Sequence, residues 1–179
     1  VAGRTEPTSG RIVSRCWPGY PKSVGYMSFE LQEQILEEER RSDETWFHHG
    51  EVDPGRTPAD LFAVGPTENF ELLNRLVSLF GIDHLINRGL KFLSTGELRK
   101  VLLVNALRRG ISLLILDEPF DGLDAASRDH LSGLIDTLAE EGAGIIMILG
   151  RYDEIPKSAD KLIILEEGRV TYHGNLPAA

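Results

Sequence analysis

Two nearly continuous apolar runs stand out in the C-terminal half of the chain, at Ile111–Leu116 and Gly144–Leu149. Apolar runs of this length are typical of strands that are buried on both faces of a parallel sheet. Between them, apolar residues recur at helical spacing from Ala125 to Glu141, and Asp124 is placed to cap the first turn. Because strand, helix and strand in this order form a parallel pair, the pattern predicts an α/β sheet flanked by helices.

The N-terminal half has the periodicity of helices instead. Phe29–Arg41 is amphipathic and rich in glutamate, Thr67–Phe80 carries an apolar stripe that ends before Gly81, and Ile82–Arg88 predicts a short helix. The polar stretch Ser42–Thr57 predicts a loop. The stripe of the second helix consists of Phe70, Leu72, Leu73, Leu76, Val77 and Phe80. We therefore expect a helical subdomain inserted into the α/β lobe.

Further strands are expected toward the two ends of the chain. Arg11–Ser28 has short apolar stretches broken by prolines and glycines, which indicates a strand, a turn and a strand. Lys161–Leu165 and Arg169–His173 flank a Glu-Glu-Gly turn, and this pattern predicts a β-hairpin.

A length of 179 residues, 41% of them apolar, suits one globular domain with a subdomain. We expect residues 1–28 and 108–179 to form the α/β lobe and residues 29–107 to form the helical subdomain. Val1 falls at an abrupt place for a domain to begin, and we therefore expect the chain to be a piece of a longer polypeptide.

Charge and cysteine content narrow the function classes. A net charge of −9 argues against a nucleic-acid-binding surface, which needs a basic stripe. The single cysteine, Cys16, cannot form an internal disulfide, so a cytoplasmic setting is expected. No apolar run approaches the roughly 20 residues that span a bilayer, so we expect any membrane association to come through partner proteins.

Adjacent carboxylates follow the first apolar run, at Asp117 and Glu118. Open α/β sheets place their ligands at the carboxyl ends of such strands. An acid there suits a magnesium ion held mostly through water, and a neighbouring carboxylate can orient the water that attacks a γ-phosphate. Two solvated acids at a strand end are the structural alternative. The tight acidic loop that follows favours the functional interpretation; it consists of Asp121, Gly122, Leu123 and Asp124.

A helix is predicted from Ser94 to Arg109, and Ser94 with Glu97 forms a capping-box pattern. A helix N-terminus with a serine hydroxyl and little side-chain bulk at Gly96 also lets a phosphate approach the free amides. The two interpretations are compatible.

In these motifs the chain resembles an ATP-binding cassette (ABC) ATPase domain over nearly its whole length. The signature motif of that family matches Leu93, Ser94, Thr95, Gly96 and Glu97. The Walker B strand matches Leu113–Glu118, and the D-loop matches Asp121–Asp124. The resemblance implies a P-loop NTPase-like α/β fold, with ATP and Mg²⁺ as cofactors. It implies that Glu118 polarises the attacking water, that Asp117 supports magnesium, and that Ser94 and Gly96 contact ATP held by a second, head-to-tail cassette.

The phosphate-binding P-loop of the family is absent from these 179 residues, since the sequence contains no Gly-x-x-x-x-Gly-Lys-Ser/Thr. Its strands and loop would lie ahead of Val1. We therefore expect the chain by itself to be inactive toward ATP.

Two positions depart from the family pattern. Arg151 stands where the family has its switch histidine; arginine cannot relay a proton but can pair with a γ-phosphate, and a surface role is the alternative. Phe29 stands where the Q-loop glutamine is expected, and the nearby Gln32 could replace that glutamine only if the loop were rearranged.

Thr95, the Phe120-Asp121-Gly122 loop and the segment Arg151–Pro156 resemble most the first cassette of tandem ABC ATPases of the molybdate-transport and photorepair type. We expect an ATP-hydrolysing subunit with a second cassette and membrane permease subunits as partners. The alternative is a non-transport regulatory or interaction module with lost or weak turnover, favoured by Arg151 and Phe29. A DNA-repair ATPase is disfavoured, because the insert lacks heptads.

Two other clusters are weaker candidates. His48 and His49 lie near Glu51 and Asp53, but this polar loop lacks regular metal-ligand spacing. The run Glu37–Glu39 is expected to be a solvated helix face.

Overall fold

A three-stranded parallel sheet forms the centre of the α/β part in the computed structural model, which describes residues 24–42, 53–63 and 69–176. The strands are β1 (Val24–Ser28), β2 (Leu113–Asp117) and β3 (Gly144–Ile148), in that spatial order. The pairing register places Asp117 beside both Ser28 and Ile148. The parallel α/β sheet predicted from the sequence is therefore present, and of the Arg11–Ser28 stretch only residues 24–28 lie within the described residues.

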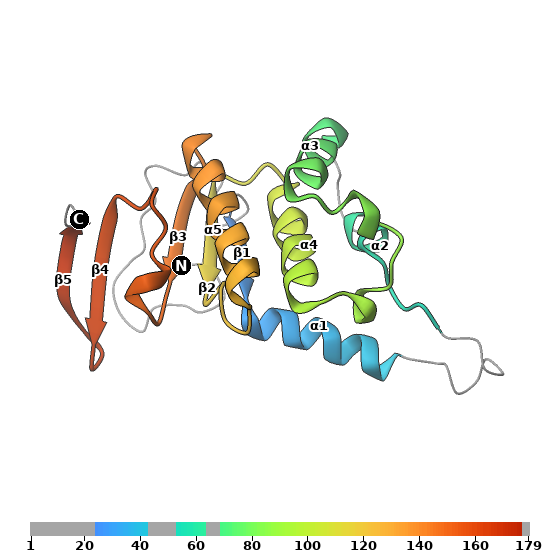
Figure 1. Cartoon of the computed structure of the whole chain (residues 1–179), viewed down its shortest axis with the longest axis horizontal. Coiled ribbons are helices and arrows are strands. Elements are labelled where there is room, and N and C mark those ends of the chain that lie inside the picture. Colours follow the sequence, from blue (N-terminus) through green and yellow to red (C-terminus); the bar gives the residue numbers. More distant parts are fainter. Residues whose placement is uncertain (1–23, 43–52, 64–68, 177–179) are drawn as a thin grey trace.

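Helices make up the segment between β1 and β2. They are α1 (Phe29–Arg41), α2 (Pro58–Ala63), α3 (Phe70–Phe80) and α4 (Thr95–Leu107), with 3₁₀ turns at Asp83–Leu85 and Leu90–Phe92. They lie on one side of the sheet in Figure 1. The predicted short helix at Ile82–Arg88 is thus a single 3₁₀ turn. Helix α2 was not predicted, because six residues are too few to show a period.

The chain returns to the sheet through helix α5 (Ala125–Glu140), which lies against it, and ends in a separate antiparallel hairpin of β4 (Lys161–Glu166) and β5 (Arg169–Asn175) (Figure 1). A 3₁₀ turn at Tyr152–Glu154 follows β3. The predicted helix and hairpin are confirmed, and the two hairpin strands extend one and two residues further than expected.

Most of the core lies between α4 and its neighbours. Helix α4 is buried on several sides, with fully or nearly fully buried Leu98, Val101, Leu102, Leu103 and Val104. The same apolar cluster takes in α3, β2 and α5. Burying this much apolar surface is the main free-energy gain of the fold and fixes both ends of α4.

Strand β3 corrects one expectation. Ile146 and Ile148 are 37% and 49% exposed, whereas β2 is buried along Leu113–Leu116. The reason is position: β2 has a neighbour on each side, whereas β3 pairs only with β2 among the described residues. Full burial on both faces therefore holds for one of the two apolar runs.

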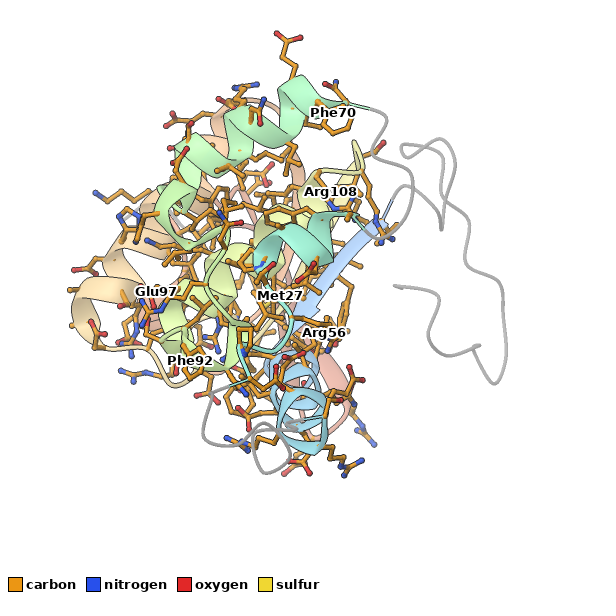
Figure 2. All side chains as sticks on the ribbon, turned by 90° about the vertical axis from the view of Figure 1, so that its right-hand side faces the viewer. Met27, Arg56, Phe70, Phe92, Glu97 and Arg108 are labelled. Atoms are coloured by element: carbon orange, nitrogen blue, oxygen red, sulfur yellow. The ribbon has the colours of Figure 1, made fainter. Side chains whose placement is uncertain are left out.

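Two side chains also differ from expectation. Phe70, assigned to the core stripe, is 69% exposed, because α3 begins at this residue and its N-terminus projects beyond the core (Figure 2). Glu39, assigned to a solvated face, is only 3% exposed: it accepts hydrogen bonds from the Arg56 side chain and from the Arg56 backbone N–H, the latter at 2.9 Å. The segment around Arg56 crosses over α1 there, which the periodicity of α1 alone could not indicate.

None of the helices in the described part of the chain is long and apolar enough to span a membrane.

Candidate functional site

The start of α4 has the geometry expected from its sequence. Ser94 is the N-cap, its hydroxyl accepts a hydrogen bond from the Glu97 N–H at 3.3 Å, and its own N–H donates to Glu97 Oε2 at 2.7 Å. The predicted capping box is therefore confirmed. The Ser94 N–H is the main reason that the pKa of Glu97 lies below its usual value. Because the box occupies only two of the orphan amides, others at this helix end remain for a ligand.

A surface pocket of about 260 Å³ opens at this helix end, between α4 and α5. Its lining includes Ser94, Gly96 and Glu97 from α4, Leu123 from the acidic loop, and Lys100 and His130. A Cβ added at Gly96 would meet Ser127 Oγ at 3.4 Å, so glycine keeps the backbone of this helix end open toward Ser127. Burial, followed by the charge of Lys100, lowers the pKa of His130.

The carboxylates lie where β2 ends. Asp117 is half-buried, and the Tyr26 hydroxyl on β1 donates a hydrogen bond to Asp117 Oδ2 at 3.1 Å. This bond orients the carboxylate and leaves its other oxygen for a further ligand. The sequence did not single out Tyr26; the parallel register, which brings β1 beside β2, is the information that was missing.

Glu118 has an uncommon backbone conformation. Its φ is +49°, a left-handed value that costs a residue other than glycine about 1–2 kcal/mol. Its N–H donates to the Ile148 carbonyl at 3.0 Å, and its carboxylate lies against Gly150, where an added Cβ would be 3.3 Å from Oε1. The strained turn therefore aims the carboxylate at the end of β3.

The acidic loop is a tight turn that leads into α5. The Asp121 N–H donates to the Glu118 carbonyl at 3.2 Å, and Gly122 takes a left-handed φ of +71°. Asp124 caps α5 by accepting hydrogen bonds from the Ser127 N–H and hydroxyl, each at 2.9 Å. The Ser127 N–H is the main reason that the pKa of Asp124 is lowered. The cap predicted at Asp124 is confirmed.

Arg151 follows Gly150 directly and lies at the surface. Its guanidinium donates two hydrogen bonds to Asp153, at 3.0 and 2.7 Å, and this pairing raises the pKa of Arg151 and lowers that of Asp153. The structure thus places the cation directly after Gly150, which lies beside the Glu118 carboxylate, with two of the guanidinium N–H donors engaged by Asp153.

Gln32 is unavailable to a ligand in this arrangement. It is 1% exposed, and its side-chain oxygen accepts a hydrogen bond from Arg99 Nε at 3.0 Å. Phe29 begins α1 beside the acidic loop, since its ring would lie 3.9 Å from a Cβ added at Gly122. Neither residue reproduces the glutamine of the family pattern here.

No group of three or more His, Cys, Asp or Glu side chains with metal-binding geometry is found within residues 24–42, 53–63 and 69–176. Asp117 and Glu118 would supply at most two carboxylates, which suits magnesium, an ion that keeps several waters and takes its other ligands from phosphate. His48, His49 and Glu51 lie outside the described residues, and Asp53 accepts a hydrogen bond from the Gly55 N–H at 2.9 Å.

The ABC transporter family profile matches residues 1–121 of the chain. The chain is 42% identical over 132 residues to the ABC transporter ATP-binding protein ModF of Escherichia coli K12, covering 73% of this chain and 27% of ModF. It is 33% identical over 184 residues to the molybdenum import ATP-binding protein ModC of Brucella abortus strain 2308, covering 97% of this chain and 48% of ModC. The chain thus spans less than half the length of these relatives.

Among solved structures, CbiO1 from Clostridium perfringens, described as part of the ABC transporter complex CbiONQ, matches with a TM-score of 0.70 at 24% identity, covering 97% of this chain and 69% of that one. The likeness confirms the P-loop NTPase-like fold. With a family profile that covers most of the chain and relatives that carry the same description, the chain belongs to the ABC transporter family of ATP-binding proteins.

Proposed function

We propose that the chain is the part of an ATP-hydrolysing ABC subunit that carries the signature motif, the Walker B carboxylates and the D-loop. The reaction is ATP plus water giving ADP and phosphate. The observation that carries this proposal is a pair of elements at one end of the helix–sheet unit: an open pocket at the capped N-terminus of α4, and an oriented acid pair at the end of β2.

Each residue has a defined task in this scheme. Glu118 accepts a proton from the attacking water, whose oxygen bonds to the γ-phosphorus while the bond to the β-γ bridging oxygen breaks. Asp117 would hold magnesium through water, and a bound ion would supply positive charge beside the phosphates. Ser94, Thr95, Gly96 and the α4 amides receive the γ-phosphate of ATP bound by a second cassette; Leu93 and Glu97 shape that helix end.

The partners follow from the same scheme. Because the pocket at the signature is open at the surface, we expect a second cassette packed head-to-tail to present its ATP there, with Asp121–Asp124 at the contact. The name of ModC, a molybdenum import ATP-binding protein, supports molybdate transport as the process served, with permease subunits placing the chain at the cytoplasmic face of the membrane. The division into a lobe of residues 1–28 and 108–179 and a helical subdomain of residues 29–107 is part of this proposal.

A second candidate function is a regulatory or interaction module of the same family with weak or lost turnover. The observations that favour it are specific. Arg151 replaces the switch histidine and is paired with Asp153, and the buried Gln32 is bound by Arg99, so neither side chain stands ready for the role that the family pattern gives its position.

The test is Glu118→Gln in the full-length gene product. The amide keeps the shape of the side chain but cannot take up a proton, so hydrolysis should fall by about 100-fold or more while ATP affinity stays the same. Phosphate release and equilibrium ATP binding are measured together. Retained turnover would remove Glu118 from its role, and absence of hydrolysis in the unsubstituted protein would favour the module.

A further inference from the structure

A fully buried arginine connects three elements around the proposed site. Arg99, in the second turn of α4, is 0% exposed. Its Nε donates to Gln32 on α1 at 3.0 Å, and its Nη1 donates to the backbone carbonyls of Pro119 and Asp121, each at 2.7 Å. Short hydrogen bonds from a cation to carbonyl oxygens are among the stronger kinds in proteins.

The two carbonyls belong to the loop that carries the proposed catalytic group. Pro119 follows Glu118, and Asp121 closes the same turn by donating its N–H to the Glu118 carbonyl. Fixing the carbonyls at both sides of Phe120 therefore fixes the turn in which Glu118 holds its left-handed φ.

Stability alone does not account for an arginine at this position. Burial lowers the pKa of Arg99, and its Nη2 has no hydrogen-bond partner within the described part of the chain. Well-packed apolar side chains often replace buried charges without loss of stability, so the guanidinium is better explained by the geometry that it imposes.

We propose that Arg99 is a positioning residue that holds the Glu118–Asp124 loop in its working shape and ties that loop to the helix that begins at Ser94. The functional consequence of this inference rests on the proposed function. A phosphate that docks at the N-terminus of α4 acts on the same rigid helix that fixes the position of the Glu118 carboxylate. The signature of one cassette is thereby coupled to the hydrolytic centre of that same cassette.

The first test uses hydrogen exchange on the 179-residue chain with Arg99→Met and, as a matched control, Arg108→Met. Arg108, the C-cap of α4, is also an almost fully buried arginine, but it donates to Asn105 and the Leu61 carbonyl, at the end of the helix opposite Glu97 (Figure 2). The amides of Glu118 and of residues 120–123 should exchange about tenfold or more faster in Arg99→Met, relative to the slowest core amides, and at an unchanged relative rate in Arg108→Met.

The second test measures turnover in the full-length gene product. Arg99→Met should lower kcat by about tenfold or more with ATP affinity within about threefold, and Arg99→Lys, which can still donate to one carbonyl, should recover part of kcat. If Arg99→Met does not fold, Arg99→Lys should show the same local exchange pattern with a smaller amplitude.

Unchanged exchange at residues 118–123 in the Arg99 variants, or the same increase in Arg108→Met, would overturn the inference. A loss of ATP affinity equal to the loss of kcat would do the same, because it would indicate a general structural role. The Glu118→Gln test is independent of these results: if it fails while exchange at the loop still depends on Arg99, the proposed function is wrong and the structural link stands.

Discussion

Arg151 has two interpretations, as a residue that pairs with the γ-phosphate or as a surface residue. It follows Gly150, which touches the Glu118 carboxylate, and it is exposed and paired with Asp153. Arginine keeps its proton at any physiological pH, so its contribution would be charge and geometry, as in an arginine finger. To reach a γ-phosphate, the guanidinium must exchange the Asp153 carboxylate for phosphate oxygens.

We predict that Arg151→Ala in the full-length gene product lowers the rate of hydrolysis by well over about tenfold, with ATP affinity largely retained. The measurement is steady-state phosphate release. Asp153→Asn is the matched control, since it frees the same guanidinium and should leave the rate equal or higher. An unchanged rate in Arg151→Ala would mean that the residue serves only at the surface.

Local motifs in the sequence named candidate site residues but not the partners of those residues. Asp117, Glu118 and Ser94 could be proposed because their motifs are local, and their functional roles stay predictions. Tyr26 and Arg99 were missed, because their acceptors, Asp117 and the Pro119 and Asp121 carbonyls, are distant in sequence and become neighbours only through the parallel register and the packing of α4.

At the scale of elements, the capping box of α4 makes part of the stability depend on pH. The folded-state pKa of Glu97 is lowered, chiefly by the Ser94 N–H. The Glu97 carboxylate therefore contributes fully to the free energy of unfolding above the ordinary pKa of glutamate, and this contribution is lost as pH falls through the lowered pKa.

We predict that Glu97→Gln lowers the free energy of unfolding by about 0.3–1 kcal/mol at neutral pH, because the charge near the helix N-terminus is removed. The difference should vanish in acid, where the wild-type carboxyl is protonated. Urea unfolding over a pH series measures both. Glu33→Gln, on the exposed face of α1, is the control, and a difference that persists in acid would contradict the charge effect.

A second element-scale prediction concerns the segment that crosses α1. Arg56→Met leaves the buried carboxylate of Glu39 without its guanidinium partner. Because Arg56 is itself 45% exposed and solvent screens the pair, we expect the free energy of unfolding to fall by about 1–3 kcal/mol. Arg75→Met removes an exposed pair with Glu141 and should cost about 0–1 kcal/mol. Equal losses in denaturant titrations would show that the carboxylate of Glu39 is adequately solvated.

Element types were predictable where periodicity was long. Helix α1 has the predicted bounds, and α4, α5 and the hairpin lie where expected. Helix boundaries and side-chain burial were less predictable. Helix α2 is too short to show a helical period, and the available signal for it was the capping pair of Thr57 and Asp60 at its start. The exposure of β3 depends on how many strands flank it, which its own sequence does not encode.

At the scale of the whole molecule, the nucleotide affinity of the 179-residue chain follows from its missing P-loop. Four or five charge-assisted hydrogen bonds, each contributing about 1.5–3 kcal/mol, are lost with that loop. We predict a dissociation constant for magnesium-ATP of about 1 mM or weaker, against about 1 µM for a complete cassette. Calorimetric titration measures it, and a value below about 100 µM would contradict the prediction.

The order of synthesis gives the parallel register one more consequence. β1 pairs with β2 from Val24 opposite Leu113 to Ser28 opposite Asp117. All of α1 to α4 lies between these two strands in the sequence. On the ribosome, β1 must therefore wait, with its hydrogen-bonding edge unsatisfied, until the helices and β2 have emerged. Non-local pairing of this kind is slow and exposes nascent chains to aggregation, so we expect packing of β1 against α4 to protect β1 until its partner strand arrives.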